Sequence, residues 1–286
     1  MLMNMKDLLK VANEHNFAVP AFNISDYAML NGIFEAVEEK QAPVIIAIHP
    51  DELSHTKPEI VKAITEKANK TKVPVCIHLD HGSSLAQIML AIKSGFTSVM
   101  IDGSSLPLEE NIAICQEIVK VAHSVDISVE GELGTIGSTD AEAEAGENEI
   151  IYTDPDVAKR FVKETGVDTL AVAIGTSHGI YPEGMEPELQ LELLKEIKSK
   201  VDIPLVLHGG SSNPDQEICR SVELGINKIN ISSDIKAAYY KKMREVLKDG
   251  SLREPNTIQP PCIKAMKEIA FHKIELFNTD DKARLY

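Results

Sequence analysis

Short apolar runs rich in β-branched residues alternate along this chain with longer segments of helical periodicity. Eight runs are predicted to be strands: Ala18 to Ile24, Pro43 to Ile48, Pro74 to Leu79, Thr97 to Asp102, Asp126 to Leu133, Asp168 to Ile174, Ile203 to His208, and Lys228 to Ser232. Helical spacing is clear in Ala28 to Glu39, Glu59 to Lys70, Glu109 to His123 and Glu188 to Lys200. This alternation predicts an α/β fold, a closed (β/α)8 TIM barrel. A doubly wound open sheet is the second architecture that the pattern allows.

Two connections are longer than such a barrel needs, Gly134 to Tyr152 and Gly179 to Pro187. Both follow strands at the carboxyl face, where barrel enzymes hold their chemistry. They are candidate lids or carriers of a mobile catalytic carboxylate, and solvated surface loops are the equal alternative. The end of the chain, Glu254 to Tyr286, is predicted to be helical after Pro261 and to close the barrel.

Composition favours one folded unit, residues 1–286, because no linker or compositional shift divides the chain. Forty-four acidic against 29 basic residues give a formal net charge of -15, which repels nucleic acid and anionic membranes. Small phosphorylated substrates remain compatible, since anion binding is local. The four cysteines form no CxxC pair, which indicates a reducing compartment. Without a signal peptide or an 18-residue apolar stretch, we expect a soluble cytoplasmic protein.

Three histidines follow strand-like runs: His81 in PVCIHLDH, His178 in LAVAIGTSH and His208 in IPLVLH. On parallel strands of one barrel, the three imidazoles would converge at its carboxyl mouth. Three histidines with one position left open are the ligands of a catalytic zinc site. A lone histidine would more often be a structural imidazole, and three in the same context weaken that alternative. Asp80 adjoins His81, so one side chain can ligate metal while the other reaches substrate, provided that the strand ends there.

Other polar side chains are expected at the same mouth. His78 points to the same side of its strand as Asp80 and is predicted to be a barrel-lining partner rather than a ligand. Asp102 ends the fourth strand and Glu132 the fifth. Each can orient a ligand histidine or bind a second metal, and a structural salt bridge in the barrel lining is the open alternative for both.

Glycines and serines end the last two strands, in HGGSS from His208 to Ser212 and NISSD from Asn230 to Asp234. In barrels this pair of loops holds phosphate, because backbone N–H groups and a helix N-terminus face the anion. The candidate phosphate-binding residues are Gly209, Gly210, Ser211, Asn230, Ser232 and Ser233. A tight turn with serine helix caps is the alternative.

Taken together, these segments resemble a known family. The motifs VPAFN, HLDHG, SVMIDGS, SVEGELG, AIGTSHGIYP, LVLHGGSS and INISSD occur in one order over nearly the whole chain. This combination resembles the class II, zinc-dependent ketose-bisphosphate aldolases, which act on fructose or tagatose 1,6-bisphosphate. The resemblance implies reversible cleavage to dihydroxyacetone phosphate and an aldehyde, glyceraldehyde 3-phosphate, and a homodimer or homotetramer.

The resemblance also implies roles for individual residues. His81, His178 and His208 would bind the zinc ion, with Asp102 and Glu132 at an alternative metal position. Asp80 would exchange the proton of the substrate's C4 hydroxyl while zinc polarises the neighbouring substrate oxygens. Gly179, Gly209, Ser211, Asn230 and Ser233 would hold the C1 phosphate, with Asn23 near the carbonyl or hydroxyl of that half, and a monovalent cation (Na⁺ or K⁺) is usual nearby.

A loop acid must protonate the carbanion that remains after cleavage. The candidates lie in Asp140 to Glu149, where Asp140 is the nearest match by position and Glu142 and Glu144 are alternatives. The class I mechanism would instead require a Schiff-base lysine in an apolar strand, and we identify none in the sequence.

Two departures from the family fall at the end of the substrate far from the C1 phosphate. Where the family places a small hydroxyl residue and an arginine for the distal phosphate, this chain has His49 and Asn256. Loss of the guanidinium removes a bidentate anion clamp. A sulfonate, as in 6-sulfofructose 1-phosphate, or an uncharged end would fit, and so would a phosphate held by His49 and a nearby Arg or Lys.

Two functions of other classes are alternatives to an aldolase. A metal-dependent barrel hydrolase would carry an HxH pair at the end of its first strand, where this chain has VPAFN. A non-catalytic phosphosugar sensor would need the phosphate loops but not Asp80, which is present beside the full histidine set.

Overall fold

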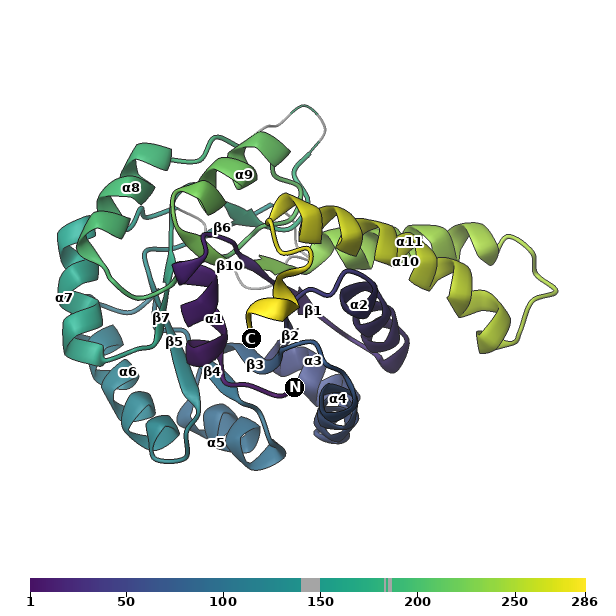
Figure 1. The fold of residues 1–286 in the computed structure, drawn as a ribbon, viewed down its shortest axis with the longest axis horizontal. Coiled ribbons are helices and arrows are strands. Elements are labelled where there is room, and N and C mark those ends of the chain that lie inside the picture. The colour runs from purple at the N-terminus through teal and green to yellow at the C-terminus, as the bar shows by residue number, and fades with distance from the viewer. Residues whose placement is uncertain (140–149, 183, 185–186) are drawn as a thin grey trace.

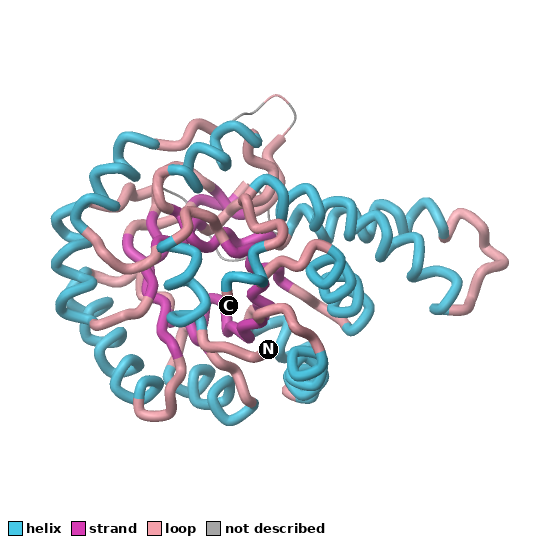
Figure 2. The backbone as a smooth tube through the Cα atoms, viewed as in Figure 1, coloured by secondary structure: helices cyan, strands magenta, loops and turns pink. Residues whose placement is uncertain are grey.

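Eight parallel strands close into a barrel in this computed structural model, which describes residues 1–139, 150–182, 184 and 187–286 (Figures 1 and 2). The barrel strands are β1 (Val19–Asn23), β2 (Val44–Ile48), β3 (Val75–Gly82), β4 (Ser98–Ile101), β5 (Ser128–Leu133), β7 (Thr169–Val172), β9 (Leu205–Leu207) and β10 (Ile226–Ile231). Strand β1 pairs in parallel with β2 on one side and with β10 on the other. The closed TIM barrel is therefore confirmed, and the open sheet is excluded.

Helices surround the barrel and cover the outward side of its strands (Figure 2). They are α1 (Met5–Glu14), α2 (Tyr27–Glu39), α3 (Pro50–Thr56), α4 (Glu59–Lys70), α5 (Leu85–Ser94), α6 (Leu108–His123), α7 (Pro155–Thr165), α8 (Leu191–Lys200), α9 (Asp215–Glu223), α10 (Ser233–Val246) and α11 (Pro255–Leu276). The four helices predicted from periodicity all form, within three residues of the expected bounds. Their apolar stripes and the outward strand residues make the larger core.

The interior of the barrel is apolar at one end and polar at the other. Met5, Leu8 and Leu9 of α1 pack against Val19 and other inward strand residues in a second, smaller core. Helix α1 thus covers the amino-terminal mouth, which faces the viewer in Figure 1. The Tyr286 hydroxyl donates to the Leu8 carbonyl at 2.7 Å and ties the chain end to this plug. Polar chemistry is therefore confined to the carboxyl mouth.

A two-stranded parallel pairing lies outside the barrel sheet. It joins β6 (Gly137–Ser138) to β8 (Ser177–His178). The strand-like run predicted through His178 is consequently broken: the barrel strand β7 ends at Val172, and Gly175 takes a φ of +118° before the chain turns into β8. His178 thus comes from this small pairing rather than from the end of a barrel strand.

The arm formed by α10 and α11 extends away from the barrel (Figure 1). Helix α11 begins at Pro255, earlier than the predicted start after Pro261, and contains Pro260 and Pro261. The two hydrogen bonds that these prolines cannot make would involve carbonyl groups one turn earlier, at residues 256 and 257. Both residues are exposed, so water can satisfy their carbonyl groups and the helix continues.

The cysteines, the hydropathy of the helices and the loop acids were also predicted from the sequence. All four cysteines are free thiols, as predicted. Among the residues that the structure describes, no helix combines the length and hydropathy that crossing a bilayer requires. The candidate loop acids from Asp140 to Glu149 lie outside the described residues.

Removing the Phe277 ring should destabilise the end of the chain where it meets the first strand. Phe277 is fully buried in the larger core, and its carbonyl accepts from the Ala18 N–H at 3.1 Å. Phe277→Ala should lower the free energy of unfolding by about 3–5 kcal/mol through lost burial and a cavity. The control Leu247→Ala, at a position 48% exposed, should stay within about 0.5 kcal/mol. Urea unfolding followed by circular dichroism measures both, and equal effects would refute this packing.

Candidate active site

Adjacent residues of β3 both reach the site because the strand carries a bulge. The pairing of β3 with β4 shifts register between Leu79 and Gly82. His81 takes a φ of +49°, in the left-handed region that non-glycine residues rarely occupy. A Cβ on Gly82 would stand 2.7 Å from the Met100 carbonyl oxygen, so the bulge needs glycine there. The expected end of the strand is thus replaced by a strained bulge, and such strain is concentrated at functional sites.

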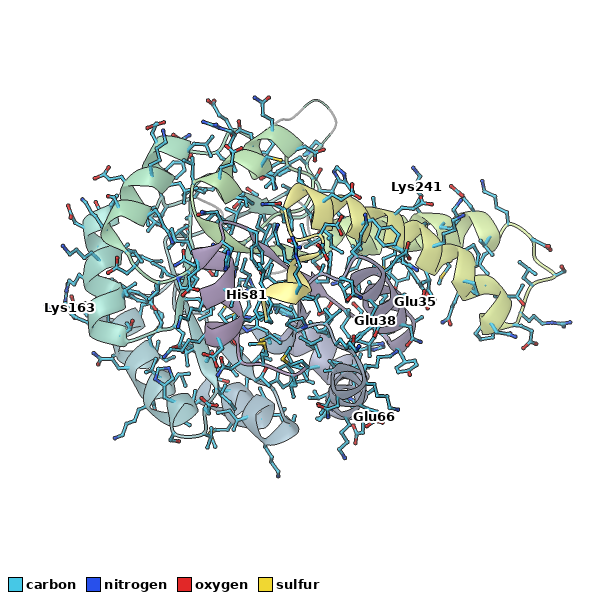
Figure 3. All side chains as sticks on the ribbon, in the orientation of Figure 1. Glu35, Glu38, Glu66, His81, Lys163 and Lys241 are labelled. Atoms are coloured by element: carbon cyan, nitrogen blue, oxygen red, sulfur yellow. The ribbon has the colours of Figure 1, made fainter. Side chains whose placement is uncertain are left out.

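The three predicted histidines do converge. The rings of His81 and His208 have centroids 4.7 Å apart, those of His81 and His178 5.2 Å, and those of His178 and His208 6.1 Å. One nitrogen from each lies within 4.8 Å of the others. All three side chains are buried. In Figure 3 the His81 label marks the middle of the barrel, where this cluster lies.

Hydrogen bonds fix which imidazole nitrogen is free in two of the three rings. His81 uses Nδ1 toward Asp102 Oδ2 at 2.8 Å, and His208 uses Nε2 toward Glu130 Oε1 at 2.8 Å. The opposite nitrogens, His81 Nε2 and His208 Nδ1, are buried without a hydrogen-bond partner among the described residues. Carboxylates that orient imidazoles in this way are typical of histidine metal sites. The donor set therefore fits a metal ion.

The electrostatics of the cluster call for positive charge. Burial lowers the pKa of His81, but the Asp80 and Asp102 carboxylates outweigh it and raise the pKa to about 10. Burial raises the pKa of Glu132 well above its ordinary value, and the charge of Asp102 adds to the rise. Burial and the neighbouring His81 lower the pKa of His178. A cation bound between them would relieve the repulsion among the carboxylates and replace the proton on His81.

Asp80 is held as a carboxylate between two amides. Its Oδ2 accepts from Asn23 Nδ2 at 2.9 Å and its Oδ1 from Asn230 Nδ2 at 3.0 Å. Burial acts to raise the pKa of Asp80, but the positive charges of His81 and Lys228 outweigh it and hold the pKa well below its usual value. Each asparagine leaves its buried Oδ1 without a partner among the described residues. The amides thus position Asp80 and offer two acceptors beside it.

A buried ion pair beneath the histidines was missed in the sequence. Lys228 Nζ contacts the two oxygens of Glu130 at 3.0 and 2.8 Å, and both side chains are fully buried. The statement that no lysine stands in an apolar strand was wrong, because Lys228 lies within β10, INKINI. Two signals were available: that lysine itself, and Glu130, which shares the inward face of β5 with Glu132 two residues on. The Lys228 amine is engaged by both oxygens of Glu130 and fully buried, so it is not presented to a substrate carbonyl.

His78 lines the barrel interior as expected and is not part of the metal-type cluster. Its Nδ1 lies 2.9 Å from Ser98 Oγ, and its Nε2 lies 3.8 Å from Glu130 Oε2. Burial lowers the pKa of His78 to about 3, so the ring is neutral.

The two predicted phosphate loops lie side by side next to His178. A small cavity there is lined by His178, Gly179, Gly209, Ser211, Asn230, Ser232 and Ser233. Helix α10 begins at Ser233, so its N-terminus faces this cavity. Gly209 takes a φ of +61°, and a Cβ there would stand 2.6 Å from the Ser177 carbonyl oxygen. Backbone at this close approach, next to a helix N-terminus, suits an anion such as phosphate.

Gly210 has a different place from the one predicted. Its N–H donates to the Asn230 carbonyl at 3.1 Å, and a Cβ would stand 2.3 Å from Ile229 Cγ2. It is absent from the residues that line the phosphate-type cavity. Gly210 therefore permits the two loops to pack together.

His49 and Asn256, the two residues that depart from the family at the distal end of the substrate, do not line one cavity in this chain. His49 caps the N-terminus of α3, and its ring centroid lies 6.3 Å from that of His81. It lines a cavity of about 360 Å³ that also includes His81 and His178. Asn256 is exposed in the first turn of α11, toward the outer end of the arm (Figure 1). His49 is thus part of the site and Asn256 is not part of this cavity.

Fold and site together define a TIM barrel whose carboxyl mouth combines a metal-type histidine cluster with loops suited to phosphate. The sequence profile of the family described as fructose-bisphosphate aldolase class-II matches residues 3–282. The chain therefore belongs to the class II fructose-bisphosphate aldolase family, whose members are metal-dependent aldolases.

Solved structures agree with this assignment. The YdjI aldolase from Escherichia coli K12 is 37% identical, with a TM-score of 0.88, over 99% of this chain and 100% of that one. The fructose-bisphosphate aldolase (Fba) from Campylobacter jejuni is 22% identical, with a TM-score of 0.83, over 98% of this chain and 96% of that one. The second likeness shows the shared fold.

Replacing the buried ion pair by apolar residues should weaken metal binding without unfolding the protein. The double variant Glu130→Leu/Lys228→Met removes both charges together, so no unpaired charge stays buried. His208 then loses the carboxylate that orients it, and the dissociation constant for Zn²⁺ should rise by about 10- to 100-fold. Competition against a chromophoric chelator measures the affinity, and thermal unfolding of the metal-free protein checks the fold. An unchanged affinity would show that Glu130 does not orient the ligand.

Proposed function

We propose that this protein is a zinc-dependent aldolase that reversibly cleaves a ketose carrying a C1 phosphate into dihydroxyacetone phosphate and an aldehyde. One observation supports this most directly. A carboxylate held by two amides, Asp80, adjoins His81, whose free nitrogen belongs to a cluster of three imidazoles. The cluster lies between a phosphate-type cavity and a larger one, and His178 lines both.

His81, His178 and His208 would hold the Zn²⁺ ion, since three neutral imidazoles with an open position make a catalytic zinc site. A second group, His81 with Asp102 and Glu132, offers an alternative metal position. When bound, the metal would supply Lewis-acid polarisation of the substrate's oxygens. Asp102 and Glu130 then act through the rings that they orient.

Asp80 is the proposed base for the C4 hydroxyl proton. Its low pKa keeps it ionised at neutral pH, and Asn23 and Asn230 fix both oxygens toward the mouth of the barrel. Transfer of the hydroxyl proton to Asp80 would accompany breakage of the C3–C4 bond. The unpaired Oδ1 atoms of the two asparagines would accept from substrate hydroxyls and orient them.

The C1 phosphate would occupy the small cavity beside His178. Its backbone N–H donors and hydroxyls would come from Gly179, Gly209, Ser211, Ser232 and Ser233, with Asn230 at the border to Asp80. The N-terminus of α10 adds a favourable dipole. A monovalent cation, Na⁺ or K⁺, would complete the charge balance at this anion.

The loop acid, the exact substrate and the assembly are proposed from the family resemblance. The acid that returns a proton to the carbanion is assigned to Asp140, with Glu142 and Glu144 as alternatives, and all three lie outside the described residues. Fructose or tagatose 1,6-bisphosphate, giving glyceraldehyde 3-phosphate, are the first substrates to test, and 6-sulfofructose 1-phosphate is the alternative. A homodimer or homotetramer is the expected assembly.

Asp80→Ala separates this proposal from a non-catalytic phosphosugar sensor. In an aldolase, removal of this base should lower turnover by about 10²- to 10⁴-fold, because proton transfer is part of the bond-breaking step. Bound zinc should stay stoichiometric, since Asp80 is not among the clustered ligand atoms. A coupled assay for dihydroxyacetone phosphate release, run on a panel of ketose 1-phosphates with and without a chelator, measures turnover.

The matched control is Asp202→Ala, which removes an exposed carboxylate before the amino end of β9, at the opposite end of the barrel from the site. It should leave turnover and zinc content unchanged. Chelator-resistant release of product, or full activity in Asp80→Ala, would contradict the proposed function.

A further inference from the structure

The larger cavity lies on the opposite side of the histidines from the phosphate-type cavity. Its volume is about 360 Å³, and most of its walls lie at the ends of β2, β3, β4 and β5, whereas the phosphate-type cavity lies at the ends of β8, β9 and β10. Of the residues that the structure describes, His178 alone lines both cavities. A substrate whose C1 phosphate rests in the small cavity must therefore extend its other end past the histidines into the large one.

The charges of this larger cavity are unsuited to a second phosphate. Its described lining has three acidic side chains, Asp51, Asp102 and Glu132, of which Asp102 is hydrogen-bonded to His81, and it has no Lys or Arg. A phosphate monoester carries about -1.5 to -2 charges near neutral pH and is usually recognised by Arg or Lys. This chain supplies the cavity with negative charge instead.

Neutral hydrogen-bond donors line the same cavity. His49 Nδ1 accepts from the Asp51 N–H at 3.3 Å, so Nε2 is the ring nitrogen that carries a hydrogen and can donate it. The side-chain oxygen of Gln87 accepts from the Ser83 N–H at 2.8 Å and from its hydroxyl at 3.1 Å, which leaves the amide nitrogen to donate. Ser105 adds a hydroxyl at the rim. Such donors and the nearby carboxylates suit sugar hydroxyl groups, which both donate and accept.

We infer that the aldehyde half of the substrate is an unphosphorylated polyhydroxy aldehyde, with His49 and Gln87 as the residues that select it. The inference rests on the proposed function, since it concerns the second half of the same substrate. In the synthetic direction, a C–C bond forms between C3 of dihydroxyacetone phosphate and the aldehyde carbon. One proton leaves C3, and the aldehyde oxygen gains one.

Two measurements on the zinc-loaded protein separate this inference from the proposed function. The first is exchange of a C3 hydrogen of dihydroxyacetone phosphate in D₂O, followed by NMR, which requires no aldehyde. The second compares kcat/KM for condensation with D- or L-glyceraldehyde, erythrose and threose against that with glyceraldehyde 3-phosphate. We expect exchange, and an efficiency at least about tenfold higher with a neutral aldehyde, as one unpaired charge or lost hydrogen bond commonly costs that factor.

The outcomes differ for the two claims. Absence of exchange overturns the proposed function and the inference with it. Exchange together with equal or better use of glyceraldehyde 3-phosphate, or with no condensation of any neutral aldehyde, overturns the inference alone. A cation contributed to the cavity by a second copy of the chain would give the phosphate-preferring result.

A charge-reversal variant tests the cavity itself. Asp51→Arg should raise the efficiency ratio of glyceraldehyde 3-phosphate to glyceraldehyde by about tenfold, because it replaces a carboxylate with an anion-binding group. Glu66→Arg makes the same change of net charge on the outer helix α4 (Figure 3) and should alter the ratio less than about twofold, because exposed distant charges are screened. Equal shifts in Asp51→Arg and Glu66→Arg would contradict the inference.

Gln87→Leu tests the neutral donor in the same cavity. The variant should raise the KM for glyceraldehyde about tenfold and leave the rate of C3 hydrogen exchange almost unchanged, because exchange requires no aldehyde.

Discussion

The buried ion pair between Glu130 and Lys228 is the interaction on which the site depends. It joins β5 to β10, which are not neighbours in the barrel, and lies between the apolar plug below and the histidines above. Lys228 keeps Glu130 ionised: burial raises the pKa of that carboxyl, and the ammonium charge outweighs it and lowers the pKa. The ionised carboxylate in turn holds His208 with its other nitrogen free. A fully buried pair contributes little net stability, so its value lies in fixing the ring above it.

Charge distribution then divides the mouth of the barrel into three regions. The phosphate loops offer backbone donors and a helix N-terminus, the histidines and Asp80 occupy the middle, and the opposite cavity is acidic with neutral donors. For the proposed substrate, this division would place the anionic end over β9 and β10 and the other end in the opposite cavity. Burial, with the charge of Asp102, raises the pKa of Glu132, and the Asp80 and Asp102 carboxylates raise the pKa of His81 against the effect of burial, so the middle region favours a bound cation. Orientation of substrate and preference for metal follow from one set of carboxylates.

Much of this arrangement could be predicted from the sequence because it depends on local pattern. Strand periodicity placed all eight barrel strands, and the residues that follow them brought His81, His208, Asp102 and the two glycine–serine loops to one mouth of the barrel. Three features depended on tertiary structure. His178 is positioned by β8 pairing with β6, Asp80 and His81 share the site through a bulge, and Gly210 packs against β10. Glu130 and Lys228 were missed because their partnership spans 98 residues, although each faces the interior by simple alternation.

The central claim is that three imidazoles, two of them oriented by carboxylates and the third carried by β8, hold one metal ion at the barrel mouth. X-ray absorption spectroscopy of protein loaded with one equivalent of Zn²⁺ measures the ligand atoms and their distances directly. The account predicts three imidazole nitrogens at about 2.0–2.1 Å, with the fourth position taken by a light oxygen ligand. The same spectrum on His208→Ala protein should show one imidazole fewer. A spectrum dominated by carboxylate oxygens, unchanged in His208→Ala, would contradict it.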